Sequence, residues 1–344
     1  MGTDTRRYAM IDMAKGVGIT LVVYGHCLRG LRSAGFIPQD SALIITDYIV
    51  YTFHMPLFFI ASGLFFGRSL RKSNFDFWTN IFKNILYPYF FWSLLCGSIQ
   101  IILSGSSATN SGMSASRLSE ILWNPISPFW FLYALFFSYA IAWALKGISV
   151  EISLIIGLCL LVASFYTIGG VVSDVFYGFT YFSLGMYIQK QKLIDVIPAS
   201  YGAALGVVVI FFITAFASYS LGVPDRMAFI AALLGVIATA TICRLIECKL
   251  DNGPLVSALS ALGQYSMGIY VMHIIFIVAI RTILLRIFLM NNIPVVMIAA
   301  ILCGIFLPLL IQNILVRFGI NNLFGLPFSA VKINNATANH KIYE

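Results

Sequence analysis

Residues 10–29 read MIDMAKGVGITLVVYGHCLR, an apolar segment long enough to cross a membrane that is interrupted by Asp12, Lys15 and His26. In a helix, the eleven residues from Lys15 to His26 make about three turns, so both side chains lie on one face about 16 Å apart, with Asp12 one turn before Lys15. Ionisable side chains inside a membrane span are rare, face protein or water rather than lipid, and mark functional pathways. This face is therefore the first candidate for a site.

The composition defines the class of protein. The chain has 344 residues, of which 60% are hydrophobic and 10% charged, and its mean hydropathy is +0.92. Soluble domains carry about 25% charged residues. The sequence thus predicts an all-α polytopic membrane protein, and no segment between the apolar stretches is long enough to form a soluble domain.

A window of about 19 residues predicts about ten transmembrane helices. The sixth is the least regular, because Gly169, Gly170 and Asp174 lie at its start. The predicted spans cover residues 10–29, 43–66, 81–103, 128–146, 150–168, 171–189, 199–220, 226–246, 264–288 and 293–317.

The distribution of positive charge predicts the orientation. If the N-terminus is cytoplasmic, fifteen of the 21 Lys and Arg residues fall on the inner side, which favours both termini inside. The net charge of +8 is then a topology signal, and no basic run with interleaved aromatic residues indicates a nucleic-acid partner. We expect a transmembrane domain over residues 1–320 and a polar cytoplasmic tail over 321–344.

Two other features are of limited consequence. The six cysteines fall within or beside predicted spans without a Cys-x-x-Cys pair, and no histidine stands at metal-ligand spacing, so neither disulfides nor a metal site is indicated. The outer loop 104–127 is rich in Ser, Gly and Asn. It is either a flexible connector or a lid over an extracytoplasmic substrate, and residues 116–123 could form a short interfacial helix.

The second span contains FHMPLFFIASG, residues 53–63. Pro56 removes a backbone donor and disfavours helix at the residue before it, which predicts a break or kink near Met55. Irregular backbone at membrane depth is tolerated only when it is buried in protein or lines a wet cavity. His54 beside this break is therefore either a cavity residue or a hydrogen-bonded packing residue.

A basic cluster follows the second span. Arg68 and Arg71 lie one turn apart, with Lys72 next to them, and two guanidinium groups on one face suit bidentate binding of phosphate. The alternative is that these residues only enforce topology and contact anionic lipid headgroups.

These motifs together resemble the membrane acyltransferase-3 family. The first-helix pattern is a basic residue, Lys15, followed eleven positions later by His26. Residues 53–63, the pair Arg68 and Arg71, the segment PFWFL at 128–132, and Ser266, Tyr270 and His273 are similar to later motifs of that family and occur in its order. The variant with Asp12 and Phe-His-Met-Pro is most similar to the branch of fucose 4-O-acetylases and related sugar O-acetyltransferases. Many relatives carry arginine at the position of Lys15, so the planar fork is lost here.

The resemblance implies a ten-helix enzyme of the bacterial inner membrane. It would take an acetyl group from cytosolic acetyl-CoA, with no metal, and transfer it to a sugar hydroxyl of a surface polysaccharide, an O-antigen of lipopolysaccharide or a lipid-linked glycan. A hydroxyl acceptor needs a general base, and the pKa of histidine suits that task. We therefore expect His26 to be catalytic, either as the base or as a transiently acetylated residue. Lys15 and Asp12 would assist His26, and Arg68, Arg71 and Lys72 would bind the phosphates of CoA.

Five further residues are candidates for the cavity or for contacts with the acceptor. Trp130 begins the fourth span, where it either belongs to an aromatic belt or stacks on a sugar. His273 shares a helix face with Ser266 and Tyr270, which is also typical of a structural hydrogen-bond cluster. The candidates are His54, Ser62, Trp130, Tyr270 and His273.

Two other classes of protein remain open at this stage. A proton-coupled transporter or a flippase for lipid-linked sugars would also use intramembrane Asp, Lys and His residues. Carriers often have paired broken helices in two repeated halves, but the second half of this chain has no counterpart of residues 53–63. A scaffolding protein would leave Lys15 and His26 without a function.

Overall fold

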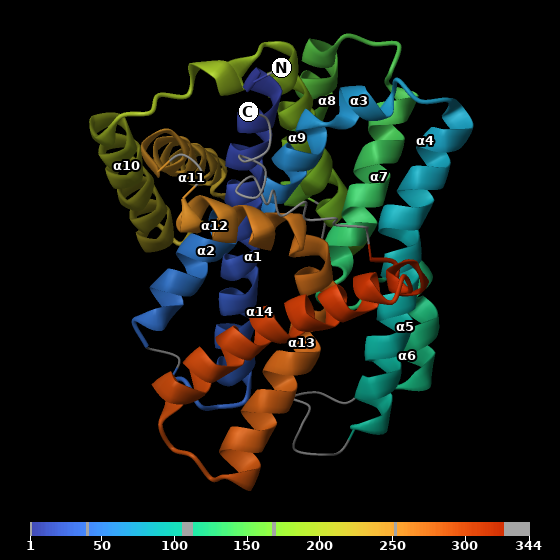
Figure 1. The fold of residues 1–344 in the computed structure, drawn as a ribbon, viewed down its shortest axis with the longest axis vertical. Coiled ribbons are helices and arrows are strands. Elements are labelled where there is room, and N and C mark those ends of the chain that lie inside the picture. Colours follow the sequence, from blue (N-terminus) through green and yellow to red (C-terminus); the bar gives the residue numbers. More distant parts are fainter. Residues whose placement is uncertain (1, 39–40, 105–112, 167–169, 251–252, 327–344) are drawn as a thin grey trace, which may run out of the picture.

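The computed structural model describes residues 2–38, 41–104, 113–166, 170–250 and 253–326, without the side chains of residues 2–8, and in these ranges the regular structure is entirely helical (Figure 1). The α-helices are α1 (Gly2–Ser33), α2 (Leu43–Leu64), α3 (Phe66–Ser69), α4 (Asn74–Ile81), α5 (Tyr87–Ile102), α6 (Ala115–Ser119), α7 (Trp130–Ala144), α8 (Val150–Tyr166), α9 (Gly170–Lys190), α10 (Tyr201–Ser220), α11 (Phe229–Leu250), α12 (Pro254–Gln264), α13 (Ser266–Thr282) and α14 (Ile293–Arg317). Short 3₁₀ and π segments are η1 (Phe82–Leu86), η2 (Glu120–Leu122), η3 (Leu193–Val196), η4 (Asp225–Met227), η5 (Ile283–Ile287) and η6 (Asn321–Phe324).

The protein is a multi-pass membrane protein. Seven stretches of helix in the described ranges are long and apolar enough to cross a bilayer, and α7 and α8 are shorter apolar helices. Each of the ten predicted spans contains a helix, since α9 occupies the sixth. The seven long stretches are Ala9–Ser33, Leu43–Ser69, Asn74–Ile102, Tyr201–Ser220, Phe229–Leu250, Ser266–Ile287 and Ile293–Arg317.

Helix α1 runs through the bundle and contacts α2, α11, α12, α13 and α14. Its closest neighbour is α12, which crosses in front of it in Figure 1. A Cβ atom on Gly263 would lie 1.8 Å from the backbone oxygen of Asp12, and one on Gly16 would lie 2.1 Å from that of Leu259. Glycine is thus required at this crossing for the two backbones to approach, as is common between membrane helices.

The structure corrects three details of the predicted elements. Of the break or kink predicted near Met55, the break is absent, because helix α2 continues through Pro56 to Leu64. The third predicted span begins earlier, at Asn74, because α4, η1 and α5 follow one another directly. Helix α12 was not predicted, since its eleven residues are too short to cross a bilayer.

The end of the described chain packs against α5. The indole nitrogen of Trp92 donates a hydrogen bond to the Phe324 oxygen at 2.9 Å, and the Tyr87 hydroxyl donates to the Leu323 oxygen at 2.8 Å. Asn321 is buried at the start of this segment. Residues 321–326 therefore belong to the folded bundle, and the rest of the predicted tail, 327–344, lies outside the described residues.

Candidate active site

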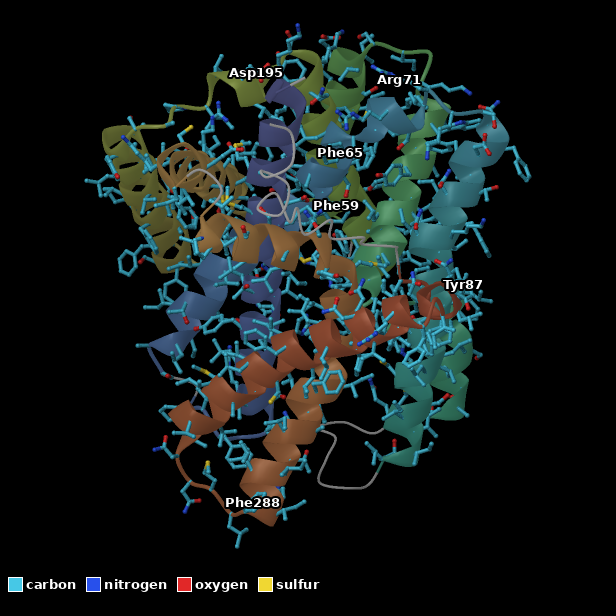
Figure 2. All side chains as sticks on the ribbon, in the orientation of Figure 1. Phe59, Phe65, Arg71, Tyr87, Asp195 and Phe288 are labelled. Carbon is cyan, nitrogen blue, oxygen red and sulfur yellow. The ribbon has the colours of Figure 1, made fainter. Side chains whose placement is uncertain are left out.

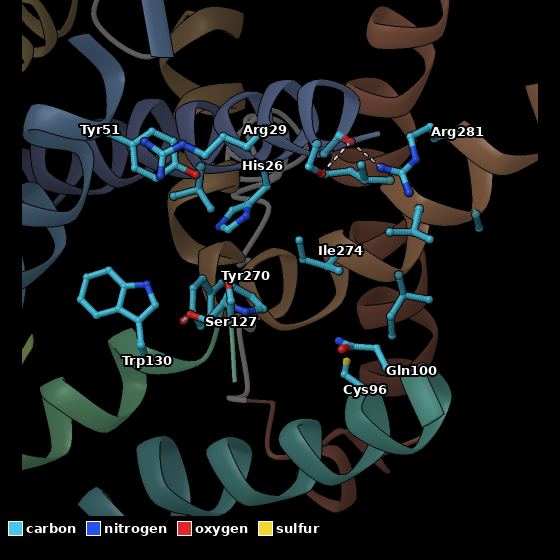
Figure 3. Close-up of a pocket in the computed structure, with 18 of the residues that line it drawn as sticks. His26, Arg29, Tyr51, Cys96, Gln100, Ser127, Trp130, Tyr270, Ile274 and Arg281 are labelled. Carbon is cyan, nitrogen blue, oxygen red and sulfur yellow. Dashed lines mark hydrogen bonds between the residues drawn. The ribbon is translucent and has the colours of Figure 1, made fainter. Parts of the chain in front are cut away.

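A cavity of about 970 Å³ contains His26. Residues of α1, α2, α5, α7, α9 and α13 line it, together with η4. Figure 3 shows the imidazole of His26 projecting into this cavity, with Tyr51 on one side, Tyr270 below and Ile274 on the other side. The part of α1 that carries His26 therefore faces a cavity between helices.

Three histidines from three helices gather around this cavity. The ring centroids of His26 and His273 are 5.1 Å apart. Tyr51 lies between His26 and His54, with its ring centroid 6.4 Å from that of His26 and 4.7 Å from that of His54. His54 lines the cavity, whereas His273 is completely buried behind His26. The structure thus brings together His26, His54 and His273, which the sequence left as separate candidates.

Backbone carbonyls determine the hydrogen position on two of these rings. Nδ1 of His54 is 2.7 Å from the Val50 oxygen, and Nδ1 of His273 is 2.7 Å from the Tyr270 oxygen. A carbonyl oxygen only accepts, so each Nδ1 carries the hydrogen and each neutral ring has its lone pair on Nε2. Nε2 of His273 is buried without a hydrogen-bond partner in the described structure. The atom that faces outward from His273 is therefore an acceptor.

An ion-pair network forms one wall of the cavity. Nε of Arg29 lies 3.0 Å from Asp47 Oδ1, and its terminal nitrogen lies 3.3 Å from Asp225 Oδ2. The same guanidinium stacks on the Tyr51 ring at 3.0 Å from the centroid. Since Arg29 is one turn from His26 on α1, this network holds Tyr51 against the histidine cluster.

A second pair lies beside Trp130. Arg226 forms an ion pair with Asp174 and stacks over Trp130 at 4.8 Å from the ring centroid. Both Arg226 and Trp130 line the cavity, with the buried Tyr177. This wall offers aromatic faces and charged hydrogen-bonding groups, the combination that recognises sugars and other polyhydroxylated ligands.

Sequence reasoning missed Arg29, Tyr51, Asp225 and Arg226. The available signal was weak: Arg29, Asp225 and Arg226 lie at or near ends of predicted spans, where charged residues are expected for topology alone. Their association depends on the packing of α2 and η4 against α1.

Lys15 lies in a second, smaller cavity. This cavity has a volume of about 230 Å³ and is lined by Lys15 and Ser62. Nζ of Lys15 is 3.0 Å from Oδ1 of Asp12, as the spacing predicts, and Oδ2 of Asp12 accepts a hydrogen bond from Gln264 at 3.3 Å. The Ser62 hydroxyl donates to the Phe58 oxygen of its own helix at 2.9 Å. Lys15 and Asp12 thus pair at a distance from His26.

The two cavities share a wall made of Val22, Met55 and Tyr270. Each of these residues stands within one turn of a histidine in sequence, namely His26, His54 or His273. The Tyr270 hydroxyl donates to the Pro128 oxygen at 2.5 Å, which links α13 to the start of α7. His26 and His54 thus line the larger cavity close in sequence to this shared wall, and His273 is buried beside His26.

The basic cluster lies toward one end of the bundle. Figure 2 shows Phe59, Phe65 and Arg71 in that order toward the end opposite Phe288. Arg68, Arg71 and Lys72 are exposed and line neither cavity. The Arg68 guanidinium lies 5.6 Å from the ring centroid of Phe65, which lines the smaller cavity. Arg68, on α3, is thus placed near the smaller cavity and beyond the end of the helix that carries His54.

This fold defines a multi-pass helical membrane protein with titratable side chains at the junction of two internal cavities. The chain belongs to the acyltransferase-3 family, because the acyltransferase-domain profile of that family matches residues 8–312. The resemblance of its motifs to this family is thereby confirmed. No solved structure matches the chain.

A curated relative is similar over a shorter region. The nodulation protein NolL of Mesorhizobium japonicum is 34% identical over 143 residues. The match covers 40% of this chain and 35% of NolL. The chain therefore aligns with about a third of the length of that relative.

Proposed function

We propose that the protein is an integral membrane O-acetyltransferase of the bacterial inner membrane. It moves an acetyl group from cytosolic acetyl-CoA to a sugar hydroxyl of a cell-surface polysaccharide, an O-antigen or a lipid-linked glycan, with about ten spans and both termini cytoplasmic. The position of His26 beside the wall between the two cavities is the observation that carries this proposal. A transferase needs one base within reach of both a donor and an acceptor that arrive from opposite sides.

His26 is the proposed general base. It removes the proton of the acceptor hydroxyl while that oxygen attacks the carbonyl carbon of the thioester. A C–O bond forms, the C–S bond breaks, and His26 returns the proton to the sulfur of the departing CoA. Nε2 of His273 lies behind His26 and has no hydrogen-bond partner in the described structure. In the proposed reaction the His26 ring turns so that its second nitrogen donates to this lone pair, which orients the ring and stabilises its protonated form.

The smaller cavity is the proposed donor side. Its lining by Lys15, Ser62 and mostly apolar residues suits the acyl thioester and the arm that carries it. Lys15 would contact the donor, while Asp12 lowers the cost of placing its charge in the membrane. Arg68, Arg71 and Lys72 would hold the phosphates of CoA outside this cavity. Trp130 and His54 would face the acceptor in the larger cavity.

Transfer of radiolabelled acetyl groups by purified protein tests the proposal. In proteoliposomes with labelled acetyl-CoA and a panel of candidate glycans, the wild-type protein should label a glycan, and His26→Ala should not. His340→Ala, which removes a histidine outside the described residues, is the matched control and should retain activity. A proton-coupled carrier or a flippase would transfer no label with any acceptor, and full transfer by His26→Ala would exclude His26 as the base.

A further inference from the structure

The larger cavity has two chemically different walls. The wall around Tyr51 and Trp130 is aromatic and charged, as described above. The opposite wall is formed by α5 and α13 with the residues that directly follow each of them. It consists mainly of aliphatic side chains, namely Ile99, Leu103, Ile274, Ile277, Val278 and Ile283. A sugar does not use such a surface, because burying a hydroxyl without a hydrogen-bond partner is unfavourable.

The aliphatic wall continues to the outer surface of the bundle. Ile283, which lines the cavity, is 37% exposed, and Ile102, next to the lining residue Leu103, is 80% exposed. Both lie in stretches that are apolar enough to span the membrane. The aliphatic lining of the cavity therefore adjoins apolar helix surface that the bilayer can contact.

A buried guanidinium stands on this aliphatic wall. Arg281 on α13 lines the cavity and is only 5% exposed. It donates a hydrogen bond to the Gly30 oxygen at 2.7 Å, and Gly30 is one turn from His26 on α1. Figure 3 shows Arg281 on the opposite side of His26 from Tyr51 and Trp130. A cationic fork among aliphatic side chains suits an anion that is attached to a hydrocarbon chain, such as a phosphate ester.

We propose that the acceptor is a lipid-linked glycan, bound through its phosphate by Arg281. The hydrocarbon chain lies along α5 and α13, and the attached sugar extends past His26 toward Tyr51 and Trp130. The identification of the bound glycan as the acceptor rests on the proposed function. Binding of a lipid phosphate by Arg281 does not depend on acetyl transfer. The shared chemistry is a phosphate on a hydrocarbon chain, which a bilayer phospholipid also carries.

Binding of simple probes to the purified full chain in detergent tests this site. Native mass spectrometry would compare farnesyl phosphate, farnesol and inorganic phosphate. Because charge-assisted hydrogen bonds to the phosphate add to burial of the chain, farnesyl phosphate should bind about tenfold or more tightly than either fragment. Arg281→Gln should remove the advantage over farnesol, while Arg281→Lys should retain part of it. Arg286→Gln, which removes a cation five residues further along that is not part of the cavity lining, is the matched control and should behave as wild type.

Several results would overturn the proposal. Equal affinity of the wild-type protein for farnesyl phosphate and farnesol would show that there is no phosphate site, even before any variant is tested. Displacement of farnesyl phosphate by an equal concentration of phosphatidylglycerol would reassign the site to bilayer lipid. Failure of acetyl transfer with normal farnesyl phosphate binding would instead count against the proposed function alone.

Discussion

Replacing His273 by phenylalanine tests the proposed pairing with His26. The side chain of His273 is completely buried, and phenylalanine fills a similar volume without offering a lone pair to His26. Two imidazoles joined by an N–H···N bond of ordinary length have ring centroids about 5 Å apart. The observed centroid separation of 5.1 Å has this size, so rotation of the His26 ring would form a bond to Nε2 of His273, which has no hydrogen-bond partner in the described structure.

The size of the effect follows from the charge that develops on His26. When His26 takes the hydroxyl proton, the hydrogen bond to His273 becomes charge-assisted, and such bonds contribute about 1.5–3 kcal/mol. Loss of this contribution in the transition state lowers kcat by about 10- to 150-fold. The KM for acetyl-CoA should not change, because His273 lines neither cavity and makes no direct donor contact.

Steady-state kinetics with the labelled donor measure both constants. His273→Gln, whose amide oxygen can replace the acceptor nitrogen, should recover part of kcat. Met272→Leu is a control for repacking, since Met272 is a buried neighbour on α13 without a titratable group. If kcat of His273→Phe stays within about twofold of wild type while the protein remains folded, His273 does not act on His26 and the pairing is refuted.

Two further predictions concern the donor side and the helix packing. The double variant Arg68→Ala, Arg71→Ala should raise the KM for acetyl-CoA by about tenfold with little change in kcat. High salt should reduce the difference from wild type, because both residues are exposed. An unchanged KM would mean that the two residues only enforce topology. Gly263→Ala should lower the thermal stability by an amount equivalent to about 1–3 kcal/mol, because the added Cβ would lie 1.8 Å from a backbone oxygen of α1. Gly206→Ala, whose Cβ would meet nothing within 4 Å, should not be destabilised in the same thermal-unfolding assay.

Local sequence patterns predict the class of protein and the helices well. Long apolar runs predict spans because hydrocarbon requires every backbone group to bond within its own helix. The pairing of Lys15 with Asp12 at 3.0 Å was also predictable, since residues three apart share a helix face. The break predicted near Met55 is wrong, because α2 continues as a helix through Pro56.

The arrangement of the site depends on contacts between distant segments. His26 was a candidate from its place on an apolar helix, yet its contact with His273 joins α1 to α13. The network of Arg29, Asp47 and Asp225 joins α1 to two further segments, α2 and η4, in the same way. Helical periodicity says which side of a helix is polar, but it carries no information on which other helix will face that side.

The sequence by itself therefore determined that this is a helical membrane protein of the acyltransferase-3 family, and it identified His26 and Lys15 as residues on one face of the first span. Only the tertiary structure decided that these two residues belong to adjoining cavities, with Val22, Met55 and Tyr270 between them. The physical reason is that helix formation in the membrane is governed by local apolarity, whereas a cavity exists only where helices from distant parts of the chain pack without filling the space between them.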